Sequence, residues 1–235
     1  MFPVSDEPRT RTFPYVNIAL ILACILIFIY EVTLPERDIN RFFFDYGVVP
    51  KQIWDWLQDP SGLDEPGTVI SSAFVHGGVL HLVGNMLYLW VFGDNIEDVL
   101  GHFVYLLFYF AAAIGAVALQ VAVDPDSIVP MIGASGAISG VMGGYFVLYP
   151  TARVDVLVIF FIFPVPAVLL IGFWFALQLL AGIATIGTAE GASEGVAVWA
   201  HVGGFITGLL IILALRPFIR IRPLAERRRR RAPDW

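Results

Sequence analysis

The sequence predicts an all-α protein that crosses a membrane several times, and two observations lead to this fold class. Hydrophobic residues make up 58% of the 235 residues and charged residues only 14%, whereas about a quarter of a soluble domain's residues are charged. Charge is also absent from whole blocks, among them Val16–Tyr30, Phe103–Val123 and Val196–Leu215. Each block approaches the ~20 apolar residues with which a helix crosses a bilayer. A soluble protein can bury one such helix, but not a series of them.

Prolines and charges divide the apolar sequence into six predicted membrane-spanning helices. They cover roughly residues 15–32, 70–92, 103–123, 132–149, 166–187 and 196–215. The first is expected to remain as a helix, because residues 1–15 mix acids, arginines and prolines and do not resemble a cleaved signal. The aromatic run Phe160–Phe163, between the fourth and fifth spans, fits either the membrane interface or an early start of the fifth helix.

The basic residues predict which helix ends face the cytoplasm. Six spans place both termini on one side, and a cytoplasmic location for that side gives it 11 of the 14 basic residues, as the positive-inside tendency favours. The expected organisation is a cytoplasmic segment 1–14, a six-helix domain 15–215 with an outward-facing first loop at about 33–69, and a basic cytoplasmic tail 216–235. We expect an integral protein of a bacterial-type plasma membrane.

The basic run Arg227–Arg231 closely follows a predicted membrane helix. Such a run can bind nucleic acid, but attraction to the anionic lipid of the cytoplasmic leaflet is the simpler explanation beside a membrane. We therefore expect the lipid bilayer as a partner of the tail, and no nucleic acid.

Polar side chains inside three of the spans indicate a functional site, because polar groups are costly in hydrocarbon. They are His81 and Asn85 in the second span, Ser135 in the fourth and His201 in the sixth. Counted from the cytoplasmic helix ends, Asn85, Ser135 and His201 all lie about 20 Å into the membrane at 1.5 Å per residue. The hydrocarbon core is ~30 Å thick. The three helices therefore bring polar groups together in its outer half, with His81 about one turn higher.

Ser135 lies in the run Gly133-Ala134-Ser135-Gly136 at the expected start of a helix. Serine is a weak nucleophile until a base takes its proton, and His201 is the candidate base at the matching height. The free N–H groups of a helix N-terminus can stabilise the oxyanion that forms when a serine attacks a peptide carbonyl. Asn85 and His81 are four residues apart, so they share a helix face and can add donors. Taken alone, this run also fits an ordinary helix start with small residues.

Small residues recur every four positions along two of the predicted helices. They are Gly136, Gly140 and Gly144 in the fourth span, and Ala200, Gly204 and Gly208 in the sixth. Such stripes let membrane helices approach closely. We expect the two stripes to face each other and to hold Ser135 and His201 within hydrogen-bond distance.

Over residues 15–215 the sequence resembles the rhomboid family of intramembrane serine proteases. The shared patterns are G-x-S-G at Gly133–Gly136, A-H-x-x-G at Ala200–Gly204, H-x-x-x-N at His81–Asn85, and Gly93 with Glu97 near the end of the second helix. The resemblance implies a six-helix bundle with a Ser–His dyad in a water-filled cavity that opens on the extracytoplasmic side. It implies Ser135 as nucleophile, His201 as general base, and His81, Asn85 and the Ser135 amide as oxyanion donors. It also implies that single-span membrane proteins are the substrates, cut within or beside the transmembrane segment.

Two positions depart from patterns that some family members show. Ser139 stands where they have a tyrosine packed on the catalytic histidine, so the residue that orients His201 is not identified. Residues Gly67–Ser72 do not contain their Trp-Arg pair. Among the other polar residues, we expect His76 near the outer entrance of the second helix, His102 at the cytoplasmic interface, and Glu97 as a structural hydrogen-bond acceptor.

The residue content argues against metal and redox chemistry. Cys24 is the only cysteine, so neither an intramolecular disulfide nor a multi-cysteine metal site can form. No H-E-x-x-H motif is present, and Asp94, Glu97 and Asp98 lie at the opposite helix end from His81. We expect no metal and no cofactor.

Two other functions remain open at this point. One is a catalytically silent relative that binds transmembrane segments without cutting them, although Ser135 and His201 are both present. The other is a transporter, which would distribute polar residues through the depth of the membrane and commonly shows two related halves. The sequence does not identify the substrate or the oligomeric state.

Overall fold

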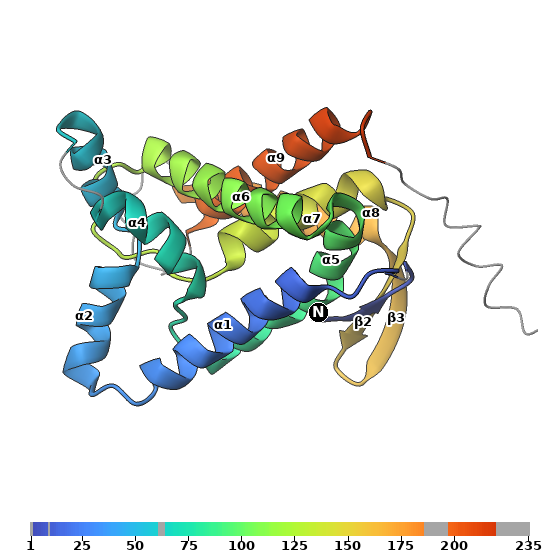
Figure 1. Ribbon diagram of the computed structural model, residues 1–235, viewed down its shortest axis with the longest axis horizontal. Helices are drawn as coiled ribbons and strands as arrows, with labels where there is room; N and C mark the ends of the chain where they lie inside the picture. The colour runs from blue at the N-terminus through green and yellow to red at the C-terminus, as the bar shows by residue number, and fades with distance from the viewer. Residues whose placement is uncertain (1, 9, 61–63, 186–196, 220–235) are drawn as a thin grey trace, which may run out of the picture.

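The computed structural model describes residues 2–8, 10–60, 64–185 and 197–219 (Figure 1). Helices form most of this part of the chain. They are α1 Tyr15–Glu31, α2 Glu36–Tyr46, α3 Pro50–Gln58, α4 Asp64–Ser71, α5 Val79–Leu100, α6 His102–Val123, α7 Ser135–Leu148, α8 Ala167–Thr185 and α9 Val198–Leu215, with a 3₁₀ turn, η1, at Ser72–Phe74. Three strands complete it: β1 Phe2–Asp6, β2 Arg153–Val158 and β3 Phe161–Pro166.

Within the described residues, three helices are long and apolar enough to cross a membrane. They are α6, α8 and α9, and a fourth span results if α4 with η1 and α5 count together as one helix bent by 83°. The helices α1 and α7 are apolar but shorter. The prediction of a mostly helical membrane protein is confirmed, whereas the number of six spans stays a prediction.

The short length of α7 follows from where its chain enters the bundle. Its 14 residues give about 21 Å at 1.5 Å per residue, less than the ~30 Å hydrocarbon core. The preceding segment is not helical: Met131 forms an isolated antiparallel bridge with Val48, and residues 129–133 line a cavity. Irregular backbone is tolerated at membrane depth where it borders a cavity or protein. The predicted fourth span, 132–149, therefore becomes a helix only at Ser135.

The helix in the predicted second span, 70–92, begins and ends later than predicted. The helix begins at Val79 and continues to Leu100, while the residues before it turn through η1. Extended backbone at Gly78 (φ 165°, ψ 164°) separates the two parts. The helix ends at Gly101, whose φ of +77° lies in the left-handed region that glycine adopts without strain. The single apolar run therefore contains a bend that hydropathy does not reveal.

A three-stranded antiparallel sheet in the order β1-β2-β3 corrects the all-α prediction. It lies at the end of the bundle where α1 begins, opposite to α2, α3 and α4 (Figure 1). Phe2 pairs with Leu157, and Arg153 pairs with Pro166. The aromatic run Phe160–Phe163 consequently belongs to the β2–β3 hairpin, partly to its turn and partly to strand β3, rather than to the fifth helix. Alternating β-branched residues in β2 favour a strand, and two prolines in β3 disfavour a helix.

The centre of the bundle is α7, which packs against α5, α6, α8 and α9 (Figure 1). Ten of its 14 residues are buried, so the helix is held in place from several sides. The core around it is largely aliphatic and aromatic, with fully buried tyrosines at 105, 109 and 145. The first loop, predicted at about 33–69, contains α2, α3 and the start of α4.

Candidate active site

Ser135 is the first residue of α7, and a glycine turn places it there. Gly133 has φ +115°, a backbone conformation that residues with a side chain rarely adopt. A Cβ on Gly133 would also lie 2.6 Å from His81 Nε2, so the position excludes larger residues for two reasons. The first backbone N–H groups of α7 have no intrahelical partners, and that of Ser135 is among them.

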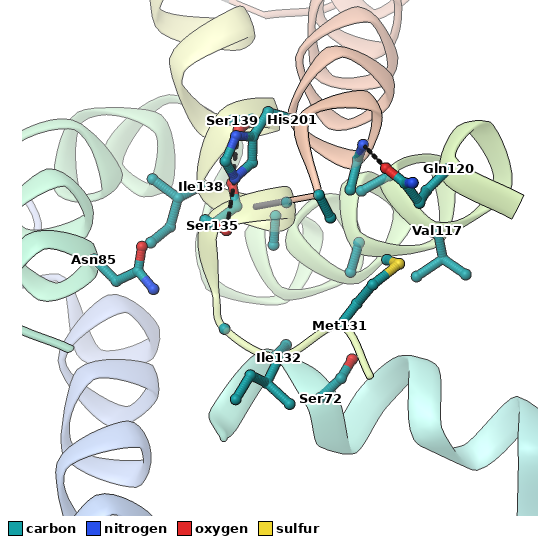
Figure 2. Close-up of a pocket in the computed structure, with 18 of the residues that line it drawn as sticks. Ser72, Asn85, Val117, Gln120, Met131, Ile132, Ser135, Ile138, Ser139 and His201 are labelled. Carbon is teal, nitrogen blue, oxygen red and sulfur yellow. Dashed lines mark hydrogen bonds between the residues drawn. The ribbon is translucent and has the colours of Figure 1, made fainter. Parts of the chain in front are cut away.

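His201 lies within hydrogen-bond distance of Ser135. The distance from His201 Nε2 to Ser135 Oγ is 2.9 Å, and the two side chains approach from α9 and α7 (Figure 2). The expectation that the two helices bring these residues together is confirmed by this geometry. A neutral imidazole whose Nε2 is unprotonated can accept the hydroxyl proton from this position.

Gln178 of α8 contacts the other nitrogen of the same ring. Its Oε1 lies 3.0 Å from His201 Nδ1. An amide oxygen only accepts, so this contact requires the proton on Nδ1 and leaves the Nε2 lone pair for Ser135. The ring of Trp174, one helical turn earlier, has its centroid 5.8 Å from that of His201. These two side chains contact the imidazole of His201, for which the sequence left the orienting residue unassigned.

The sequence interpretation missed Gln178, although a signal was present. Gln178 is an amide in an otherwise strongly apolar predicted span, and a polar group there needs a partner. Ser139 stands at the position where some relatives have a tyrosine, and its hydrogen bond goes to the backbone of α7. Its hydroxyl donates to the Ser135 carbonyl oxygen at 2.6 Å.

Asn85 and His81 approach the backbone just before Ser135. A Cβ on Gly133 would lie 3.3 Å from Asn85 Nδ2, besides its contact with His81, so all three meet at one point. Asn85 is buried, and among the described residues its Nδ2 has no hydrogen-bond partner. A buried donor without a partner is costly. The arrangement therefore suits a bound oxygen atom next to Ser135.

A cavity of about 670 Å³ connects these residues. From Ser135 and His201 it extends past Val117 and Met131 toward Ser72 (Figure 2). Gln120, which also lines it, accepts the Ala200 N–H at 3.2 Å and so holds the first turn of α9. The walls of the cavity combine apolar side chains with a few polar groups, which is typical of a ligand site.

The glycine stripes face each other as predicted. A Cβ on Gly204 would lie 2.0 Å from the Gly136 carbonyl oxygen, and one on Gly208 would lie 2.0 Å from that of Gly140. Gly140 also leaves no room for a Cβ beside Ala112 of α6. Backbone touches backbone along this contact, which positions Ser135 and His201 at its end.

Two further polar residues, Glu97 and His76, are buried away from the Ser135–His201 contact and bond to backbone groups or to other side chains. Glu97 is buried and accepts the backbone N–H groups of Val16 and Asn17, at 3.0 and 2.7 Å, and it also contacts His102. Its predicted role as a structural acceptor is confirmed. His76 is buried just before α5, where its N–H donates to Glu31 at 3.1 Å. Within the described ranges, no three His, Cys, Asp or Glu side chains gather as a metal site would require.

Comparisons with known proteins agree with the resemblance read from the sequence. A family model described as Rhomboid domain matches residues 64–218. Rhomboid protein 1, mitochondrial, of Saccharomyces cerevisiae is 33% identical over 199 residues, which are 78% of this chain and 54% of that protein. RHOMBOID-like protein 4 of Arabidopsis thaliana is 30% identical over 66% of this chain and 36% of its own length. Rhomboid protease GlpG of Klebsiella pneumoniae is 30% identical over 43% of this chain and 32% of its own.

The chain spans about half, or less, of the length of these relatives. Their names also bear on the predicted membrane. Several relatives are named as mitochondrial proteins, among them the yeast protein and two further Arabidopsis proteins, RHOMBOID-like proteins 6 and 12. A membrane location is supported, but the more specific prediction of a bacterial-type plasma membrane is not.

Proposed function

The chain belongs to the rhomboid family, and from this premise we propose that it is an intramembrane serine endopeptidase. Its proposed substrates are single-span membrane proteins, cut within or beside the transmembrane segment. The observation that supports this most is the 2.9 Å contact between His201 Nε2 and Ser135 Oγ. It occurs in a cavity at a helix N-terminus, beside an unpaired amide donor.

In the proposed acylation step, His201 Nε2 takes the Ser135 hydroxyl proton while Oγ attacks the carbonyl carbon of the scissile peptide bond. The carbonyl oxygen becomes an oxyanion. Donors for it are the Ser135 backbone N–H, Asn85 Nδ2 and His81. The imidazolium then gives its proton to the leaving amine, the C–N bond breaks, and an acyl-enzyme remains.

Deacylation repeats these steps with water as the nucleophile. His201 takes a proton from water, whose oxygen attacks the ester carbon, and the proton returns to Ser135 as the new carboxyl end leaves. Water reaches the ester through the 670 Å³ cavity.

Gln178 provides the hydrogen-bond acceptor for the histidine Nδ1–H, which a carboxylate provides in a three-residue triad. With its Oε1 on Nδ1–H at 3.0 Å, it keeps the imidazole in the tautomer whose Nε2 can act as base. A neutral amide stabilises the transient imidazolium less than a carboxylate would, because it offers a dipole instead of a full charge. In this proposal Gln178 is a positioning residue rather than a catalytic one.

The proposed membrane arrangement uses α1, α5, α6, α7, α8 and α9 as six spans, with both termini in the cytoplasm. The apolar composition of α6, α8 and α9 supports three of these spans directly. The asymmetric distribution of basic residues supports the orientation. The domain then comprises residues 15–215, and the cavity opens on the side away from the termini.

We further propose that substrates are recognised partly by local helix instability. An intact helix engages its carbonyl groups in hydrogen bonds, so Ser135 needs an unwound segment. Glycine and proline lower the cost of unwinding, by about 1 and 3 kcal/mol relative to alanine. Replacing such residues near the cleavage site with leucine is expected to slow cleavage.

The test is cleavage of a panel of single-span substrates by the purified protein in liposomes, beside Ser135→Ala. The proposal expects at least one substrate to be cut by the wild type and none by the variant. Fluorophosphonate labelling supplies the second readout. A wild-type protein that cleaves nothing and does not react at Ser135 would be a silent relative that only binds membrane segments, and the protease proposal would be wrong.

A further inference from the structure

The tip of the β2–β3 hairpin has five consecutive large apolar side chains that the protein leaves uncovered. Their exposed fractions are 79% for Ile159, 88% for Phe160, 68% for Phe161, 58% for Ile162 and 52% for Phe163. A contiguous apolar patch of this kind marks a surface that contacts something other than water. The tip lies outside the helices that could span a membrane, so its exposure needs an explanation of its own.

The base of the same hairpin is polar and fixed to the bundle. Arg153 is exposed there, and Asp155 accepts the Ser5 hydroxyl at 2.7 Å. The Ala167 N–H, at the start of α8, donates to the Ala152 carbonyl oxygen at 2.8 Å. The tip is therefore held at a defined place relative to the helices, and the hairpin is polar at one end and apolar at the other.

The turn itself contains an unusual residue. Ile159 has φ +57°, in the left-handed region that β-branched residues rarely adopt and that hairpin turns usually give to Gly, Asn or Asp. An isoleucine there adds both backbone strain and exposed apolar surface to the turn. Both are unfavourable in water and only the strain remains unfavourable in lipid.

The apolar surface continues without a charge into α8. No Asp, Glu, Lys or Arg occurs between Asp155 and Glu190, and the exposed side chains of Leu169 and Phe173 follow on the helix. The helix α8 is one of the candidate membrane spans. The uncharged segment is thus longer than the α8 span alone, and its additional N-terminal residues form the hairpin.

The hairpin runs across the end of the bundle at which α1 begins, and its tip projects to the side, past α1 in this view (Figure 1). An element placed crosswise at the end of a set of membrane helices lies at the level of the interface. Amphipathic elements at that level bury their apolar part at the boundary of headgroups and acyl chains.

We propose that the hairpin tip, Ile159–Phe163, inserts into the lipid leaflet at the end of the bundle where α1 begins, and so anchors the α7–α8 connection to the membrane. Its partner is the acyl region of the bilayer. Pairing with a second copy through the edge strand is disfavoured, because Pro164 and Pro166 remove two amide donors from β3. The contact is independent of whether Ser135 is a nucleophile.

The test uses a nitroxide spin label on a single cysteine, Phe160→Cys with Cys24→Ala, in vesicles of phosphatidylcholine and phosphatidylglycerol. The matched control is Thr151→Cys, which lies in the same α7–α8 connection but at the exposed base. Power saturation compares collisions with oxygen, which concentrates in lipid, and with a nickel chelate, which stays in water. We expect oxygen to dominate several-fold at residue 160 and the chelate to dominate at residue 151.

Equal access of the chelate to both positions would overturn the proposal. So would a label at residue 160 that is shielded from both reagents. Shielding with dipolar broadening that grows with protein density would identify a second copy as the occupant. If Phe160→Cys alone lowers thermal stability, Ile162→Cys gives the same comparison from the neighbouring exposed position.

Discussion

The contact between α7 and α9 differs in kind from the contact that α8 makes with the same helices. The first is made of backbone, with Gly204 against Gly136 and Gly208 against Gly140 at distances that leave no room for a side chain. The second is looser and involves side chains: only 17% of the α8 span is buried, and a Cβ on Gly182 of α8 would meet the side chain of Trp199 on α9. Yet Gln178 of α8 is the residue that contacts His201 Nδ1.

This difference separates two requirements of a serine–histidine pair. The distance between Ser135 and His201 depends on the rigid glycine contact, while the tautomer and ring orientation of His201 depend on the loosely packed α8. A tight contact tolerates no substitution, because backbone cannot move aside. A loose contact can break and re-form without loss of the bundle. The following predictions test this division.

The largest effect is expected from the pair itself. Ser135→Ala and His201→Ala should each lower turnover by on the order of 10⁶-fold, which is the loss seen when the nucleophile or the base of a serine protease is removed. The double variant should be no worse than either single one, because His201 has no task once the hydroxyl is gone. Cleavage in proteoliposomes measures this, with thermal stability as control. Losses that add would show that the two residues act separately.

Asn85→Ala should lower turnover by roughly 10²- to 10³-fold, as loss of one oxyanion donor does. Its Nδ2 has no partner among the described residues, so the bundle should keep its thermal stability. Removal of His81 should matter similarly or less. Single-turnover cleavage at the wild-type rate by Asn85→Ala would rule out its role as a donor.

Gly204→Val should reduce activity by roughly 10²-fold through misplacement of the pair, and should also lower thermal stability. It touches neither catalytic atom, but its side chain would meet the Gly136 carbonyl oxygen. The matched control is Gly172→Ala on α8, where a Cβ finds only ordinary contact with Phe146 at 3.6 Å. If both variants behave alike, the rigid contact does not position the pair.

The smallest effect is expected at Gln178. Loss of one neutral hydrogen bond amounts to about 1 kcal/mol, so Gln178→Leu should lower kcat about fivefold and leave KM unchanged. Gln178→Glu keeps an acceptor for Nδ1–H and should retain more activity than the leucine variant. Leu177→Ala, on the exposed side of the same helix, serves as control. A rise in KM without a fall in kcat would assign Gln178 to substrate binding instead.

The position of the dyad could be predicted because a helix has a fixed rise. Equal counts from the cytoplasmic ends placed Ser135 and His201 at one level, and repeating glycines indicated which helix faces would meet. Both inferences use only local periodicity, which the sequence displays directly. The structural role of Glu97 was predictable because the topology places it at the opposite helix end from His81, although its donors, Val16 and Asn17, lie about 80 residues away and could not be predicted.

Features that depend on distant partners could not be predicted. The sheet forms because β1 pairs with a strand about 150 residues away, and nothing in residues 2–6 specifies that partner. Gln178 stands out in the sequence as a polar residue in an apolar span, but a single amide forms no sequence pattern that would indicate His201 as its partner. At the bend before Val79 the His76 N–H donates to Glu31, 45 residues away, and no hydropathy profile contains this contact.

The most direct measurement of the central claim is the site at which a fluorophosphonate reacts. The reagent forms a covalent bond with a serine only when a base activates its hydroxyl. Mass spectrometry of the labelled protein in liposomes should find the adduct on Ser135 in the wild type, and none after His201→Ala. An adduct on another residue, or an adduct on Ser135 that survives His201→Ala at the wild-type rate, would contradict the account.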